Sequence, residues 1–145
     1  MRDTMRHVIG AVVGLAALPV IYYGLAIASH RLLDRIGDFD VSSEGTGLYV
    51  TMLVGVGIVL AVLAGWQLLS PLAPLLAGAG LSLVGGIWAI DPGAAVLELV
   101  SFPAASGLVG ASGVYLLIGV MMLLLAFVPS RWRSRRAAAP DGLSP

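Results

Sequence analysis

Cysteine and lysine are both absent from this chain of 145 residues, and ionisable side chains of any kind are scarce. The lack of cysteine excludes disulfides, thiolate metal sites and thiol redox chemistry. Charged residues make up 11% of the sequence, and the eight positive charges, all of them arginines, balance eight negative charges. Because no basic stripe is left over, we do not expect the protein to bind nucleic acid.

Most of the chain consists of four apolar stretches without Asp, Glu, Lys or Arg, at residues 8–28, 47–69, 72–90 and 108–128. A helix of about twenty residues, rising about 1.5 Å per residue, crosses the hydrocarbon core of a bilayer, which is about 30 Å thick. Hydrophobic residues make up 59% of the sequence and the mean hydropathy is +0.99, which is more apolar surface than a water-soluble fold of this length can bury. The sequence therefore predicts an all-α integral membrane four-helix bundle.

The chain divides into a predicted transmembrane domain, residues 1–128, and a tail, residues 129–145. The tail begins with PSRWRSRR and ends with AAAPDGLSP. The second part lacks the apolar residues needed to fold, so we expect a basic and then disordered cytoplasmic segment. Basic residues beside a membrane attract anionic lipids, and an acidic partner is an alternative. The candidate docking residues are Arg131, Trp132, Arg133, Arg135 and Arg136.

Arginines are distributed unevenly along the chain. Six of the eight lie before the first apolar stretch or after the last one. Arg31 and Arg35, in the loop after the first stretch, are outnumbered by four acidic residues. Positively charged flanks stay in the cytoplasm, so we predict a multi-pass protein of the cell (plasma) membrane with both termini cytoplasmic. The first stretch imitates a signal peptide, but its apolar run exceeds the usual length of about 7–15 residues, and we expect an uncleaved anchor.

Prolines and short segments predict several local features. Pro19 lies in the middle of the first stretch, where it removes a backbone hydrogen bond and predicts a kink. The helix is expected to continue through HRLLDRIG to Gly37. Pro71 and Pro74 suit the first turn of a new helix, which predicts a tight antiparallel hairpin of the second and third stretches. The apolar segment 94–102 is too short to cross and is expected to lie on the outer surface.

Small residues recur at four-residue spacing within the apolar stretches. Helices in a bilayer cannot use the hydrophobic effect to associate, so close backbone approach at small residues is a main source of packing energy. We therefore expect the stretches to meet through these positions. The candidate packing residues are Gly10, Gly14, Gly57, Ala61, Gly65, Gly78, Ser82 and Gly86, followed by Gly107 and Ala111 near the start of the last stretch.

The segment Gly110-Ala111-Ser112-Gly113 resembles the GxSG motif of rhomboid intramembrane proteases, which implies a serine nucleophile at the start of a transmembrane helix. Such a serine needs a base, which rhomboids place on a later span, and no histidine follows Ser112. His30 is predicted on the same outer side, which leaves a non-homologous dyad open. Four apolar stretches, against six spans in the protease core, favour a packing role for these small residues.

Acidic residues cluster after the first stretch, as Asp38, Asp40 and Glu44. Their spacing departs from that of an EF-hand loop, so we expect a solvated acidic loop. His30 and Asp34, one helical turn apart, are too few for a metal site. Coupled transporters generally place ionisable residues inside the membrane, and these stretches offer no acidic or basic one. No metal, cofactor or catalytic residue is therefore predicted.

Four short segments, RHVIG, LSPLAP, WAIDPG and PSRWR, together resemble uncharacterised small four-span membrane proteins of high-G+C Gram-positive bacteria. The resemblance covers most of the chain. It implies the four-span fold and no activity.

Three functional hypotheses are compatible with these features. The first is a non-catalytic structural or accessory subunit that packs against membrane lipids and another membrane protein, or against itself. The second is a homo-oligomeric pore or holin-like channel, although no stretch has a continuous polar stripe to line water. The third is an enzyme acting on lipids at the outer interface, for which the candidate residues are His30, Asp38, Asp40, Glu44, Asp91 and Glu98.

Overall fold

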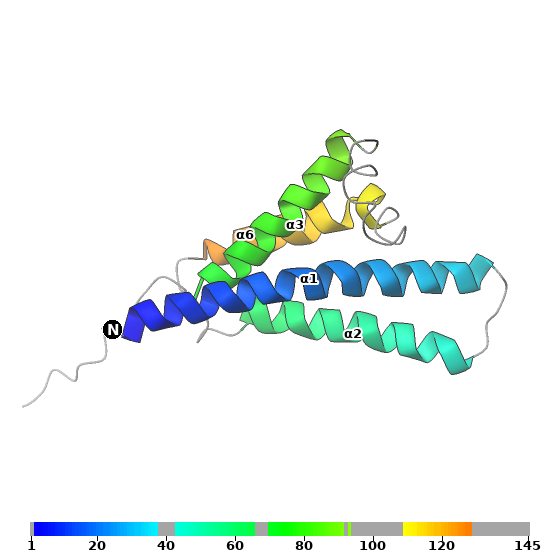
Figure 1. Ribbon diagram of the computed structural model, residues 1–145, viewed down its shortest axis with the longest axis horizontal. Helices are drawn as coiled ribbons and strands as arrows, with labels where there is room; N and C mark the ends of the chain where they lie inside the picture. Colours follow the sequence, from blue (N-terminus) through cyan, green and yellow to red (C-terminus); the bar gives the residue numbers. More distant parts are fainter. Residues whose placement is uncertain (1, 38–42, 66–69, 92, 94–108, 129–145) are drawn as a thin grey trace, which may run out of the picture.

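The computed structural model describes residues 2–37, 43–65, 70–91, 93 and 109–128, and in these ranges the chain forms helices and no strand. The helices in chain order are α1 (Arg2–Gly37), α2 (Ser43–Gly65), α3 (Leu72–Ile90) and α6 (Val114–Ala126) (Figure 1). Three of them, α1, α2 and α3, are long and apolar enough to cross a membrane. The predicted all-α class is confirmed.

The first helix is much longer than the apolar stretch from which it was predicted. α1 contains 36 residues, which corresponds to about 54 Å of helix against about 30 Å of hydrocarbon core. It ends at Gly37, as expected from the helix-forming residues that follow the stretch. Pro19 lies inside α1, and the helix continues through it without a break. Pro19 has no backbone N–H, so one hydrogen bond is missing at this point of the continuous helix, and the kink expected there stays a prediction.

The fourth apolar stretch forms a shorter helix than predicted. α6 contains 13 residues, about 20 Å of helix, and begins at Val114 rather than near residue 108. The preceding residue, Gly113, has a φ of 74°, a left-handed conformation that glycine adopts without strain. The Gly113 N–H donates to the carbonyl oxygen of Gly110 at 3.1 Å, which closes a turn ahead of α6. This turn separates residues 109–111 from α6.

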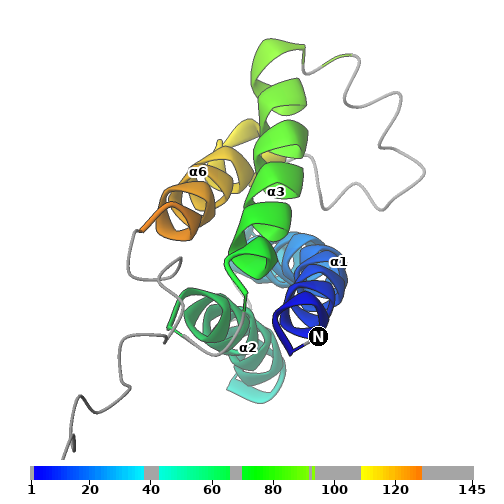
Figure 2. The same ribbon diagram turned by 90° about the vertical axis from the view of Figure 1, so that its left-hand side faces the viewer.

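The helices are arranged as two pairs, α1 with α2 and α3 with α6, and the second pair contacts the first mainly through α1. α1 and α2 run side by side, while α3 and α6 form a second pair that crosses α1 obliquely (Figure 1). Seen from the end, α2 lies on one side of α1, and α3 and α6 lie on the other (Figure 2). α1 is therefore the element that joins the two pairs.

The predicted tight hairpin of the second and third apolar stretches is wrong. α2 and α3 touch only marginally, whereas α3 makes its largest contact with α6 and a second one with α1. The reason lies in the small residues of α3, which allow α6 and α1 to approach its backbone closely. Chain connectivity places the end of α2 near the start of α3, but it does not make the two helices pack.

Glycines allow α3 and α6 to approach each other at the level of the backbone. A Cβ atom added to Gly78 would lie 2.8 Å from both the Gly119 carbonyl oxygen and the Leu123 nitrogen. A Cβ atom at Gly85 would collide with the Leu116 backbone, and one at Gly119 would lie 2.5 Å from the Ser82 hydroxyl oxygen. This interface therefore requires the absence of side chains at its glycines.

A second glycine contact holds α1 against the beginning of α3. A Cβ atom at Gly10 would lie 2.6 Å from the Cβ atom of Ser70, and one at Gly14 would lie 2.5 Å from the Ala73 carbonyl oxygen. Ala73 is fully buried. The predicted small-residue positions of the first stretch thus lie where α1 and α3 cross.

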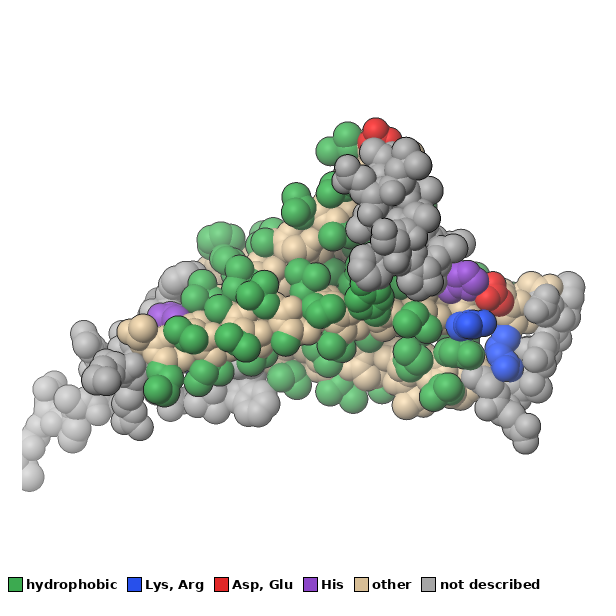
Figure 3. Space-filling model, viewed as in Figure 1, with side chains coloured by type: hydrophobic (Ala, Val, Ile, Leu, Met, Phe, Trp, Pro, Cys, Tyr) green, Lys and Arg blue, Asp and Glu red, His purple; other side chains and the backbone are tan. Residues whose placement is uncertain are grey.

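Large apolar side chains cover the outside of the described chain. Every helix has large apolar side chains that are more than half exposed. Examples are Val12, Leu15, Val54, Ile58, Leu83, Leu117 and Leu124. The space-filling view shows these hydrophobic side chains spread over the helices, with the charged side chains of the view gathered towards helix ends (Figure 3). Water-soluble monomers rarely expose apolar surface on this scale, so the structure supports a lipid environment.

Neighbouring glycines on α3 provide a matched test of this packing. Replacing Gly85 with Ala is expected to lower the free energy of unfolding by about 1–3 kcal/mol, because the added Cβ atom meets the backbone of α6. The measurement is reversible unfolding in mixed detergent micelles, followed by the loss of helicity.

The control is Gly86→Ala, where the added Cβ atom meets no atom of the described chain within 4 Å. This variant should match the unchanged protein or gain up to about 1 kcal/mol from the better helix propensity of alanine. Equal losses for the two variants would contradict the assigned interface.

Candidate functional site

The small residues of α2 form a stripe with no neighbour in the described part of the chain. A Cβ atom added to Gly57 or Gly65 would meet nothing there within 4 Å, and Ala61 between them is exposed. These three residues recur every four positions and therefore lie on one face of α2. We call this face the α2 stripe. The predicted helix contact at the α2 stripe is not made within the described residues.

The opposite side of α2 accounts for its contact with α1. Val56 and Leu63 are buried, with exposed fractions of 4% and 1%, and a Cβ atom at Gly24 of α1 would collide with a Val56 methyl group. α2 is also the least buried of the three long apolar helices. Within the described part of the chain, the α2 stripe is therefore left uncovered.

Some of the other predicted packing positions lie in helix contacts and some do not. Gly10, Gly14, Gly78 and Ser82 lie in the contacts of α3 with α1 and α6, whereas a Cβ atom at Gly86 would meet no described atom within 4 Å. Ala111 is exposed, and Gly107 lies outside the described residues. Spacing did not indicate Gly85 and Gly119, where the described backbones of α3 and α6 approach each other most closely. The signal that could have found them is weak, because glycine occurs 19 times in this sequence.

A histidine and a serine that are 63 positions apart meet where α1 crosses the start of α3. His7 Nδ1 lies 2.6 Å from the Ser70 hydroxyl oxygen, and Ser70 has no exposed surface. The same oxygen accepts the N–H of Leu72 at 3.3 Å, so the Ser70 hydroxyl is free to donate its own hydrogen to the imidazole. Sequence analysis did not pair these residues, since only the tertiary fold brings them together.

The His7–Ser70 pair has the separation of a nucleophile and its base, but its surroundings do not suit catalysis. A substrate cannot reach a serine that has no exposed surface. Two nearby N–H groups that would otherwise stabilise an oxyanion are engaged, that of Leu72 by the Ser70 hydroxyl oxygen and that of Ala73 by the Ser70 carbonyl oxygen. The pair therefore joins α1 to the start of α3 through a hydrogen bond, and we call it the clasp.

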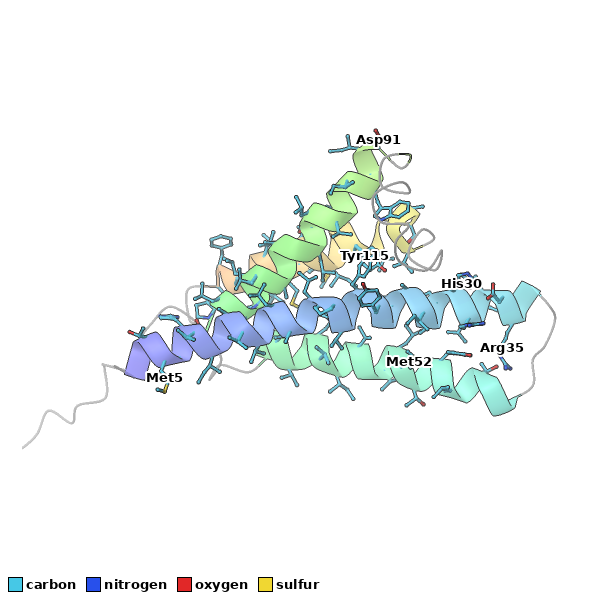
Figure 4. All side chains as sticks on the ribbon, in the orientation of Figure 1. Met5, His30, Arg35, Met52, Asp91 and Tyr115 are labelled. Atoms are coloured by element: carbon cyan, nitrogen blue, oxygen red, sulfur yellow. The ribbon has the colours of Figure 1, made fainter. Side chains whose placement is uncertain are left out.

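Three tyrosines form a cluster between α1 and α6. The rings of Tyr22 and Tyr115 are stacked with centroids 4.9 Å apart, and Tyr23 packs edge-on against Tyr22 at 5.2 Å. The Tyr115 hydroxyl donates to the Tyr22 carbonyl oxygen at 3.0 Å. Figure 4 shows Tyr115 where α6 meets α1, with His30 further along α1. The cluster ties the second helix pair to the middle of α1.

The predicted serine and histidine of a protease-like dyad each have a local partner. Ser112 donates its hydroxyl hydrogen to the Val109 carbonyl oxygen at 2.8 Å, within the turn ahead of α6. His30 Nδ1 lies 2.7 Å from an oxygen of Asp34, one helical turn away on α1. The described contacts thus assign Ser112 to the turn and His30 to a local contact with Asp34.

Several predicted site residues lie outside the part of the chain that the structure describes. These are Asp38, Asp40 and Glu98, together with Arg131, Trp132, Arg133, Arg135 and Arg136 of the tail. The side chain of Glu44 is likewise not described. Among the described side chains, no group of three His, Cys, Asp or Glu residues is placed to hold a metal ion.

Comparison of the chain with models of known protein families, with curated proteins and with solved structures returned no match.

The clasp between α1 and α3 can be tested by removing one hydroxyl. Ser70→Ala is expected to lower the free energy of unfolding in detergent by about 1–2 kcal/mol, because His7 and the Leu72 N–H both lose a partner. Thr51→Val is the control, since the Thr51 hydroxyl bonds only within exposed α2, to Gly47, and its loss should cost at most about 0.5 kcal/mol. A stability of Ser70→Ala equal to that of the control would refute the clasp.

Proposed function

We propose that this protein is a non-catalytic structural or accessory subunit of the membrane, which docks on a transmembrane helix of another protein through the α2 stripe. The open small-residue face of α2 carries the proposal. A second observation supports it. The side chains that could serve in catalysis, those of His7, Ser70, His30 and Ser112, each contact another residue of the fold.

The physical basis is the backbone approach that the stripe permits. Small residues let two helices come close enough for extensive van der Waals contact, which is the main attraction between helices in lipid. The same chain uses such contacts at Gly14 and Gly85. The α2 stripe has equivalent residues at Gly57, Ala61 and Gly65 but no described neighbour. A partner helix would complete the contact.

The proposed location is the plasma membrane, with four spans and both termini in the cytoplasm. Three long apolar helices and the exposed apolar side chains support a membrane location. The arginine distribution supports the orientation, because six of eight arginines flank the outer ends of the first and last apolar stretches. α6 would require residues on both sides of it to complete a crossing.

A homo-oligomeric pore is the alternative use of the same face. The described surface gives it little support, because the apolar part of α2 carries only two hydroxyls, those of Tyr49 and Thr51, and the Thr51 hydroxyl is bonded to the Gly47 carbonyl oxygen. The experiment on docking distinguishes the two.

Docking can be tested with a single introduced cysteine, because the natural chain has none. Ala61→Cys, in the centre of the α2 stripe, is expected to crosslink to a foreign membrane protein when whole membranes are treated with a short bifunctional maleimide. Mass spectrometry of the adduct would identify the partner, and a crosslink only between two copies of the chain would favour the homo-oligomer.

A matched pair of variants tests whether the small side chains matter. Gly57→Leu combined with Gly65→Leu should abolish the Ala61→Cys crosslink, because the larger side chains hold the partner helix away. Leu48→Phe combined with Val62→Leu enlarges exposed side chains of α2 that lie away from the stripe, and it should leave the crosslink intact. Persistence of the crosslink in the glycine variant would contradict docking through the stripe.

Orientation can be tested with single cysteines at exposed positions. Ile90→Cys, at the end of α3, should react with a membrane-impermeant maleimide in intact cells, whereas Thr4→Cys should react only after permeabilisation. The opposite pattern would show the inverted orientation.

A further inference from the structure

Pro19 leaves one backbone carbonyl group of α1 without its regular partner. In an α-helix each carbonyl oxygen accepts the N–H of the residue four positions later, and proline has no N–H. The oxygen of Leu15 therefore lacks the bond that residue 19 would supply. Apart from bonds within α1 itself, no hydrogen bond of the described residues involves this oxygen. It is left as an acceptor for a donor from outside α1.

The depth of Pro19 in the proposed span excludes lipid as the donor. Pro19 lies in the middle of the apolar stretch 8–28, about ten residues or about 15 Å of helix from either end. Hydrocarbon chains have no hydrogen-bond donor, and the lipid headgroups lie beyond the ends of the stretch. Prolines in transmembrane helices are tolerated where polar side chains and neighbouring helices satisfy the freed backbone groups. The donor is therefore expected from protein.

The face of α1 around Pro19 is turned away from the other described helices. Residues three and four positions apart share a helix face, and here they are all exposed. We call this face the Pro19 face, and it consists of Val12, Leu15, Ala16 and Pro19. α3 contacts a different side of α1, at Gly14 and Leu18, and α2 contacts α1 at Gly24. No described helix therefore covers the Pro19 face.

A serine or threonine hydroxyl on a partner helix has the charge and the size that this face requires. The carbonyl oxygen carries partial negative charge, and the hydroxyl hydrogen carries partial positive charge and donates. Before docking, such a hydroxyl bonds to the carbonyl four residues earlier in its own helix, so it enters the membrane satisfied. A charged donor at this depth is much more costly. Ala16 beside Pro19 is small, which allows a partner helix to approach closely.

We infer that the Pro19 face of α1 binds a transmembrane helix of another protein, which donates a serine or threonine hydroxyl to the Leu15 carbonyl oxygen. This inference rests on the membrane location proposed above. It is independent of docking through the α2 stripe, because the two faces belong to different helices and the Pro19 face lies away from the contact of α1 with α2. The proline in the middle of α1 then has a role in recognition, since its missing N–H exposes the acceptor.

The contact can be located by photocrosslinking of the full chain in its own membrane. The photoreactive residue p-benzoylphenylalanine in place of Val12 reacts with nearby C–H bonds, and it should form an adduct with another membrane protein. The same probe in place of Leu83, an exposed residue of α3, is the control and should label only lipid. Adducts at Val12 with lipid alone, or only between two copies of the chain, would overturn the inference.

The hydrogen bond itself is tested by a double-mutant cycle with the captured protein, measured as association in proteoliposomes. Pro19→Ala restores the N–H and should weaken association about three- to tenfold. Replacing the partner's hydroxyl residue nearest the adduct with alanine should cause the same loss with the unchanged chain and no further loss with Pro19→Ala.

Equal losses in the two backgrounds, or no loss in either, with helicity retained, would show that Pro19 does not act through the Leu15 oxygen. Docking through the α2 stripe is measured separately, by the Ala61→Cys crosslink, so failure of one contact is distinguishable from failure of the other. A failed membrane location would be detected as absence of the chain from the membrane fraction.

Discussion

Close approach of helix backbones at glycine is the interaction on which the rest of this structure depends. Gly78, Gly85 and Gly119 bring α3 and α6 into contact, and Gly14 brings α1 onto the start of α3. In lipid the hydrophobic effect gives no preference for one helix pairing over another, so the pairing follows the places where side chains are missing. The order of elements along the chain is secondary to this constraint, as the marginal contact between α2 and α3 shows.

The same constraint explains why one helix is peripheral. α2 is buried along a single face against α1, where Val56 and Leu63 lie, and its small residues are turned away from that contact. A helix with a glycine stripe that the described part of its own chain does not contact has the surface that a partner helix requires. The proposed accessory function is therefore based on a contrast. The small residues of α2 have no described neighbour, whereas small residues of α1, α3 and α6 lie in helix contacts.

Polar groups have a second organising role because they are few. The Ser70 hydroxyl holds His7 at the crossing of α1 and α3, and the Tyr115 hydroxyl ties α6 to the backbone of α1. Each hydrogen bond joins segments that are distant in the sequence. Each also satisfies a buried polar group that would bind water if it were exposed. Not every buried polar group is satisfied in this way, because the Tyr22 hydroxyl and the Trp88 indole N–H have no hydrogen-bond partner in the described part of the chain.

The sequence by itself determined that the chain is helical, that its long stretches suit a bilayer, that α1 reaches Gly37 and that α3 spans residues 72–90. These properties are local, since they depend on hydropathy, length and helix propensity. Only the tertiary structure decided which glycines touch, that Gly57 and Gly65 have no neighbour among the described residues, and that His7 meets Ser70. Helical spacing defines a face but not its neighbour, because in a uniformly apolar chain many faces are equivalent until the backbones are packed.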